Sequence, residues 1–149
     1  MEIELEEPKI KELEKIIFNP IVRIDTQQET KIMRIEIDDE LTRIDFVYYP
    51  PSYYENGGWV QIDRNSFIRP VGTKHTLPLV KAVGIPYAQQ KHYFKSYKEI
   101  LYYTLYFPAL PNDVKEIDII EREVSFGEYF NFYGVSMNKI RTSAIKILN

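Results

Sequence analysis

The stretch Leu101–Glu121, LYYTLYFPALPNDVKEIDIIE, decides the fold that we expect for this chain. Its first half alternates with a period of two, as a β-strand with one buried face does. The residues expected on that face are Leu101, Tyr103, Leu105 and Phe107. Pro108 and Pro111 then prevent ladder pairing, because proline has no backbone N–H. The KEIDIIE segment alternates again, so FPALP is predicted to carry the chain between two sheets, with Leu110 closing the end of the core.

The same rhythm continues on both sides of this block. The alternating segments are IVRIDTQ, KIMRIEI, LTRIDFVYY, GWVQIDR, SFIRP and EYFNFYGVSM. Short strands joined by turns predict an all-β protein with about seven to nine antiparallel strands in two packed sheets. In KIMRIEI, Met33, Ile35 and Ile37 fall on one face. The predicted core consists of Ile35, Ile44, Phe46, Trp59, Leu105, Phe107, Ile117, Ile119, Phe130 and Phe132.

Residues 1–19 differ from the rest and are predicted to form a short N-terminal helix or arm. Apolar residues recur there at helical spacing among Lys and Glu, which favours an amphipathic helix after Pro8. They are Ile10, Leu13, Ile16 and Ile17. An extended arm is the alternative. Asn19-Pro20 ends any helix, because the residue before proline is pushed toward extended geometry. Residues 20–149 are then the β-sandwich domain.

The composition excludes several classes of protein. A chain of 149 residues that is 44% hydrophobic is long enough for one domain with a real core. The formal charge of −3 argues against a nucleic-acid binder. The sequence has no cysteine, which excludes disulfides, thiolate catalysis and cysteine zinc sites. No apolar run approaches the roughly 20 residues of a membrane span. The acidic start, MEIELEEPKIKELEK, also lacks the apolar run of a signal peptide, and the compartment stays open.

Motifs for catalysis and cofactor binding do not occur in the sequence. It has no G-x-S-x-G, no P-loop and no Gly-rich dinucleotide turn, so no cofactor and no catalytic residue is predicted. His75 and His92 are far apart, and no metal site is predicted. The acidic turn at residues 38–40 is typical of a solvated hairpin, with calcium binding as the alternative. Glu121 could be one of two glycosidase carboxylates, although a structural role is the simpler interpretation.

The richest exposed chemistry is an aromatic loop between residues 48 and 59. The predicted ligand- or partner-binding residues are Tyr49, Tyr53, Tyr54 and Trp59. Planar rings on a loop stiffened by Pro50-Pro51 can stack on sugar rings or anchor a protein partner. The alternative is that Tyr48 and Trp59 belong to the core and the other rings cover the end of the sandwich.

Several segments, in their order along the chain, resemble a family of small bacterial immunoglobulin-like β-sandwich domains. They are LTRIDFVYY, GWVQIDRNSFIRPVGTKHTLPLVKAVGIP, ILYYTLYFPALPNDVKEIDIIE and FNFYGVS. The most specific match is FPALP followed by IDIIE, and a strand ending in Ile68 and a turn from Gly72 to Leu77 match as well. The resemblance covers about residues 20–137 and implies an immunoglobulin-like antiparallel two-sheet sandwich. Such domains look like accessory modules of cell-envelope proteins, often placed before a thioredoxin-like or hydrolase domain.

The first functional expectation is a non-enzymatic interaction or accessory module that binds another protein. Carbohydrate binding through the Tyr48–Trp59 loop is the second, and a small hydrolase is the third. A sugar binder should present two or more of the loop rings on an exposed platform. A protein binder should show an exposed apolar patch or an unpaired edge strand. An enzyme should have a pocket where polar groups converge.

Overall fold

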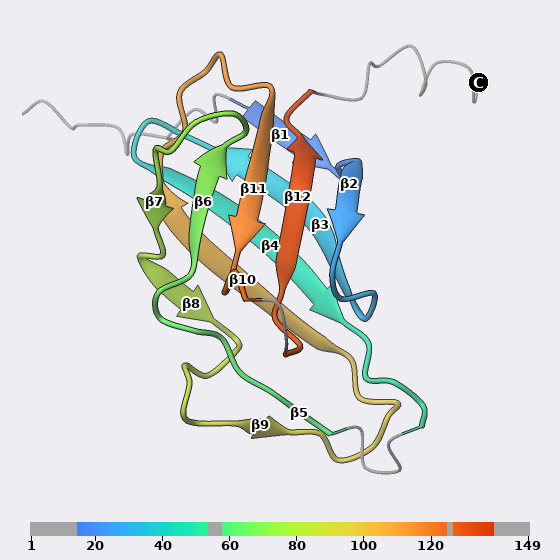
Figure 1. Ribbon diagram of the computed structural model, residues 1–149. Helices are drawn as coiled ribbons and strands as arrows, with labels where there is room; N and C mark the ends of the chain where they lie inside the picture. Colours follow the sequence, from blue (N-terminus) through green and yellow to red (C-terminus); the bar gives the residue numbers. More distant parts are fainter. Residues whose placement is uncertain (1–14, 54–57, 125–126, 139–149) are drawn as a thin grey trace, which may run out of the picture.

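Two five-stranded antiparallel sheets, here called sheet I and sheet II, make up the body of the protein (Figure 1). The computed structural model describes residues 15–53, 58–124 and 127–138. Sheet I has the order β1 (Lys15–Phe18), β3 (Thr30–Ile37), β4 (Leu41–Tyr48), β10 (Leu101–Pro108) and β8 (Lys81–Val83). Sheet II has the order β2 (Val22–Asp25), β12 (Asn131–Ser136), β11 (Glu116–Ile120), β6 (Phe67–Pro70) and β7 (Leu77–Pro78).

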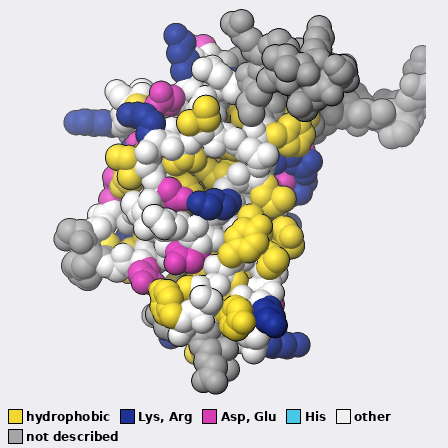
Figure 2. All heavy atoms as spheres, turned by 90° about the vertical axis from the view of Figure 1, so that its right-hand side faces the viewer, with side chains coloured by type: hydrophobic (Ala, Val, Ile, Leu, Met, Phe, Trp, Pro, Cys, Tyr) yellow, Lys and Arg dark blue, Asp and Glu magenta, His cyan; other side chains and the backbone are white. Residues whose placement is uncertain are grey.

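A short ribbon of β5 (Trp59–Val60) and β9 (His92–Tyr93) lies at one end of the two sheets. In Figure 1 sheet II is in front of sheet I, and the ribbon lies below both. No part of the chain that the structure describes is helical, so none of it is a helix suited to crossing a membrane. The side view shows hydrophobic side chains reaching the surface in several groups separated by charged ones (Figure 2).

The predicted all-β, two-sheet antiparallel architecture is confirmed, and so is the predicted crossover. Strand β10 belongs to sheet I and β11 to sheet II, so the FPALP segment joins the two layers. Leu110 is buried at this end of the core. Its backbone N–H donates a hydrogen bond to the Thr42 hydroxyl at 3.0 Å, and that hydroxyl donates to the carbonyl of Pro108 at 3.0 Å. An immunoglobulin-like strand order is not confirmed.

The predicted core residues are buried between the sheets, with Trp59 as the exception. Aromatic rings from both layers meet at the centre, where Phe46 stacks on Tyr103 at 4.9 Å between centroids and contacts Phe132 at 5.8 Å. Trp59 is 46% exposed, because in the two-residue strand β5 the alternation turns Val60 inward and Trp59 outward. The prediction that Trp59 is a core residue is therefore wrong.

A bulge in β3 also changes one predicted face. The pairing of β3 with β4 shifts register between Ile32 and Arg34. A bulge adds one residue to a strand and reverses the alternation across it. Ile32, Ile35 and Ile37 are therefore buried, while Met33, which was expected on their face, is exposed.

The N-terminal part of the described chain is a strand. Lys15–Phe18 forms β1, which pairs antiparallel with β3, and Ile17 is buried in the core. The predicted helix is therefore wrong for Ile16 and Ile17, because both belong to the edge strand β1 of sheet I. Ile10 and Leu13 lie outside the described residues. The chain then passes from sheet I to sheet II at Asn19-Pro20, where the Asn19 N–H donates to the Met33 carbonyl at 2.9 Å.

Two glycines offer a matched test of how tightly the edge strand β8 packs on β10. Both Gly72 and Gly84 have positive φ angles, +83° and +87°. A Cβ on Gly84 would lie 2.7 Å from the backbone carbonyl oxygen of Tyr102, while a Cβ on Gly72 would meet nothing within 4 Å. Gly72→Ala should cost only the backbone strain, about 1 kcal/mol. Gly84→Ala should cost about 1–3 kcal/mol more, because the backbone of β10 must move.

Urea unfolding of both variants measures this difference in the free energy of unfolding. Equal losses for Gly72→Ala and Gly84→Ala would show that β8 does not pack on β10 at this distance.

Candidate functional site

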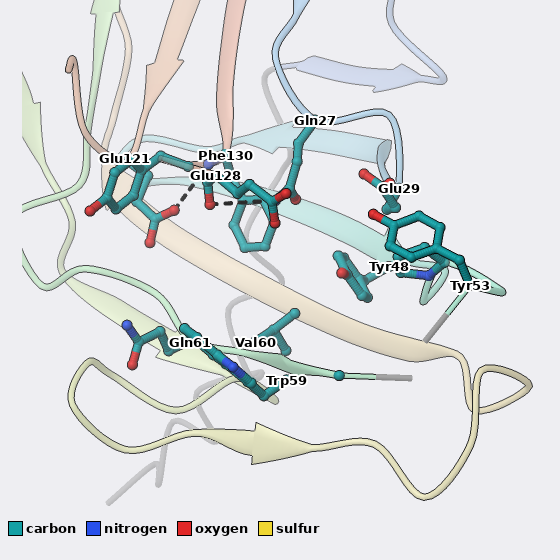
Figure 3. Close-up of a pocket in the computed structure, with 13 residues that line it drawn as sticks. Gln27, Glu29, Tyr48, Tyr53, Trp59, Val60, Gln61, Glu121, Glu128 and Phe130 are labelled. Carbon is teal, nitrogen blue, oxygen red and sulfur yellow. Dashed lines mark hydrogen bonds between the residues drawn. The ribbon is translucent and has the colours of Figure 1, made fainter. Parts of the chain in front are cut away.

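A cavity of about 380 Å³ opens at the end of the sandwich, beside the β5–β9 ribbon. The described residues that line it are Gln27, Glu29, Tyr48, Pro51, Tyr53, Gly58, Trp59, Val60, Gln61, Glu121, Glu128, Tyr129 and Phe130. They come from the β2–β3 turn, the loop after β4, β5, the end of β11 and the segment before β12. Figure 3 shows Gln27, Glu121 and Glu128 on one side of the space, and Trp59 and Gln61 on the other.

Glu121 is the structural centre of the inner wall. It directly follows β11, and it is only 6% exposed. Its Oε2 accepts a hydrogen bond from the backbone N–H of Asp63, and its Oε1 accepts one from the backbone N–H of Phe130, both at 2.9 Å. The Asn131 side chain accepts the N–H groups of Glu121 and Arg122 at 2.9 and 3.1 Å. One carboxylate thus joins the β5–β6 loop to the segment that enters β12.

Burial raises the pKa of Glu121 to about 7. Removal of water from around the carboxylate is the largest cause, and the nearby Asp63 charge raises the pKa further. The hydrogen bonds from the Phe130 and Asp63 backbones, together with the Arg122 charge, lower it. At neutral pH the site therefore contains both the charged and the protonated form of this side chain.

Two side-chain amides carry acceptors that receive no donor from the described part of the chain. The backbone N–H of Gln27 donates to Oδ1 of Asp25 at 2.9 Å, which fixes the turn after β2. The side-chain Nε2 of Gln27 donates to the carbonyl of Glu128 at 3.4 Å, and the side-chain Oε1 of Gln27 is buried without a hydrogen-bond partner. Oε1 of Gln61 is also buried without a partner. Buried polar atoms are nearly always hydrogen-bonded, so two unpaired acceptors in the lining of one cavity are an unusual feature of this site.

The aromatic loop contributes two of its four predicted residues to this cavity. Tyr53 is 71% exposed and Trp59 is 46% exposed, and both line the space. Tyr49 is exposed but does not line the cavity. Tyr54 lies outside the described residues. The structure thus brings Tyr53 and Trp59 together.

The floor of the cavity is made of packed aromatic rings. Tyr48 is buried there, as the core alternative predicted, and its ring stacks on Phe94 at 5.3 Å between centroids. The rings of Phe130 and Tyr48 make a T-shaped contact with 6.0 Å between their centroids. The backbone N–H of Phe94 donates to the Gly58 carbonyl at 3.0 Å, which holds the Trp59 segment against the body.

The other candidate groups have structural partners. Oδ1 of Asp38 accepts the N–H groups of Glu40 and Leu41 at 2.8 Å, which closes the β3–β4 hairpin. Asp118, a further acidic residue in β11, is buried, and its Oδ2 lies 3.0 Å from Nε of Arg69. Nε2 of His92 lies 2.6 Å from a carboxylate oxygen of Glu99. Within residues 15–53, 58–124 and 127–138, no three His, Asp or Glu side chains are placed to hold a metal ion.

Sequence reasoning missed most of the polar lining. Gln27 and Glu29 belong to a segment, QQET, that the sequence marks only as a turn. Glu128 precedes a strand and Gln61 follows one. Neither position forms a sequence motif with Glu121 that would predict their proximity in the fold. These four residues meet because turns from both sheets converge at one end of the sandwich. In chemical terms, the site combines exposed rings with carboxylate and amide oxygens.

Glu121 should make the stability of the protein depend on pH. Its pKa is about 7 in the folded protein, whereas its ordinary value, which applies to the unfolded chain, is 4.5. The folded protein binds more protons between these values, so the free energy of unfolding should fall as the pH rises from about 4.5 to 7. The full loss is on the order of 3 kcal/mol. Glu121→Gln should remove this slope, since the amide does not titrate.

Urea denaturation across this pH range measures the slope for the wild type and the variant. Glu128→Gln, a change in an exposed glutamate at the same cavity, should keep the wild-type slope. An unchanged slope in Glu121→Gln would show that Glu121 has an ordinary pKa.

Comparison of the chain with protein-family models, with curated proteins and with solved structures finds no match. The resemblance to bacterial immunoglobulin-like accessory domains therefore stays a prediction from the sequence. The function has to be argued from the cavity itself, from its two exposed rings, its buried carboxylate and its unpartnered amide oxygens.

Proposed function

We propose that the protein is a non-enzymatic binding module and that its cavity takes part of a carbohydrate. The observation that carries the proposal is the pairing of exposed rings with unpartnered acceptors in one cavity. Tyr53 and Trp59 supply the rings. The buried Oε1 atoms of Gln27 and Gln61 supply the acceptors. This reverses the order of the first two expectations from the sequence.

The chemistry of a sugar ring matches this lining. One face of a sugar ring is made of C–H groups, which pack on a planar aromatic side chain. Its rim carries hydroxyls, which donate hydrogen bonds to amide and carboxylate oxygens. The volume of about 380 Å³ lies within the range of small-molecule sites. A preformed cavity also lowers the conformational cost of binding.

A binding role suits Glu121 better than a hydrolytic one. A glycosidase uses one carboxyl group as an acid and a second as a base or nucleophile, both facing the scissile bond. Each oxygen of Glu121 already accepts a backbone hydrogen bond, from Asp63 or from Phe130. The carboxylate is thus engaged in holding the wall of the cavity together.

A protein partner is the second candidate, and a separate surface favours it. The outer face of sheet I has a groove of about 470 Å³ with exposed apolar side chains along it. They are Phe18, Met33, Val83 and Tyr102. Exposed apolar patches often mark interaction sites. The sequence resemblance to immunoglobulin-like accessory domains of cell-envelope proteins also supports this candidate.

Replacement of the cavity rings should separate the two candidates. Trp59→Ala and Tyr53→Ala should each weaken glycan binding by about five- to thirtyfold, because each removes a stacking surface worth about 1–2 kcal/mol. Both side chains are exposed, so the fold should survive. Tyr102→Ala, on the outer face of sheet I and 60% exposed, is the matched control and should bind as the wild type does. A glycan array followed by calorimetry with the best ligand measures these affinities.

Silence across the array would remove the carbohydrate proposal. Binding of a protein partner that Tyr102→Ala abolishes and Trp59→Ala leaves intact would favour the second candidate. Release of new reducing ends from a bound glycan would contradict the non-enzymatic role.

A further inference from the structure

The charged residues that the structure shows lining the cavity are all acidic. Among the described residues that line it, Glu29, Glu121 and Glu128 are acidic, and none is lysine or arginine. Glu128 is exposed, Glu29 is half-buried and Glu121 is buried, so acidic groups extend from the mouth to the inner wall. A cationic ligand gains more from this arrangement than a neutral one, and an anionic ligand is repelled.

The buried side-chain atoms of this lining that have no hydrogen-bond partner are both acceptors. The Gln27 side chain is in a residue only 8% exposed, and its Nε2 is engaged with the Glu128 carbonyl at 3.4 Å. Its Oε1 is therefore a buried acceptor without a partner, and so is Oε1 of Gln61. Carboxylates add only acceptors when they are charged. A hydroxyl brings one donor and two acceptor sites, whereas an ammonium group brings three donors and no acceptor.

The Trp59 ring already has an ammonium group against it. Nζ of Lys91 lies 4.3 Å from the centroid of the ring, within the range of a cation–π contact. Lys91 is not one of the residues that line the cavity. A second cation would avoid Lys91 and lie near Glu121 and Glu128. A cation there would lower the pKa of Glu121, which burial raises, and would so favour the charged carboxylate.

We propose that the cavity selects an amino sugar, with the ring against Trp59 and its ammonium group among the glutamates and the free amide oxygens. The inference rests on the proposed carbohydrate function and names the class of sugar. The ammonium group of such a sugar supplies hydrogen-bond donors to the unpaired acceptors and a positive charge to the acidic side chains. A neutral sugar of the same shape supplies fewer donors and no charge.

Calorimetry with two matched oligosaccharides tests the inference on the full chain. One probe is a β-1,4-linked glucosamine oligomer with free amino groups, and the other is the glucose oligomer of equal length and linkage. The glucosamine oligomer should bind about tenfold more tightly. Glu128→Gln and Glu29→Gln should each lower its affinity by about two- to fivefold and leave the glucose oligomer unaffected. Trp59→Ala should lower the affinity for both oligomers.

The possible failures are distinguishable. Equal affinities for the two oligomers, or tighter binding of glucose, would overturn the amino-sugar inference and leave carbohydrate binding intact. Binding of only neutral or acidic glycans on the array would have the same meaning. If neither oligomer binds and the array is silent as well, both the inference and the proposed function fail. A preference for glucosamine that Glu128→Gln and Glu29→Gln do not reduce would place the ammonium group outside this cavity and also overturn the inference.

Discussion

The carboxylate of Glu121 joins the segments that form the inner wall of the cavity. It accepts the N–H of Asp63 with one oxygen and the N–H of Phe130 with the other, at 2.9 Å each. Without it, the buried N–H of Phe130 would lose its partner at a cost of about 1–3 kcal/mol, and the partly buried N–H of Asp63 would lose its partner at a smaller cost. The burial that makes these hydrogen bonds possible also raises the pKa of Glu121 to about 7. Structure and electrostatics at this end of the sandwich thus depend on one side chain.

The two ends of the sandwich differ, and the cavity lies at the end that the β5–β9 ribbon extends. Leu110 and the FPALP crossover close the first end. At the other end the β5–β9 ribbon lies beyond the sheets, and the Tyr48–Phe94 stack joins it to the core. This arrangement leaves Trp59 outside the core and facing a space that Gln27 and Glu128 approach from the opposite side. A packed aromatic floor with exposed rings and unpaired acceptors is a suitable geometry for selective binding of a small polar ligand.

Alternation in the sequence was sufficient to predict the fold class, because a strand with one buried face must repeat every two residues. It failed where local geometry breaks that repeat, at the β3 bulge beside Met33 and in the two-residue strand with Trp59. The site was less accessible to sequence reasoning. Tyr53 and Trp59 could be selected as exposed rings on a Pro- and Gly-rich loop. Gln27 could not, because periodicity within strands does not show which turns meet at the end of a sandwich.

A carbon-detected NMR titration of the glutamate side chains tests the central claim most directly, that a buried, backbone-bonded carboxylate forms the wall of this cavity. Assigned carboxyl shifts give the pKa of each glutamate in the folded protein. The Glu121 carboxyl should titrate with a midpoint near 7, because water is largely excluded from it. A Glu121 midpoint near the ordinary value of 4.5 would show a solvated side chain and would contradict the structure of the site described above.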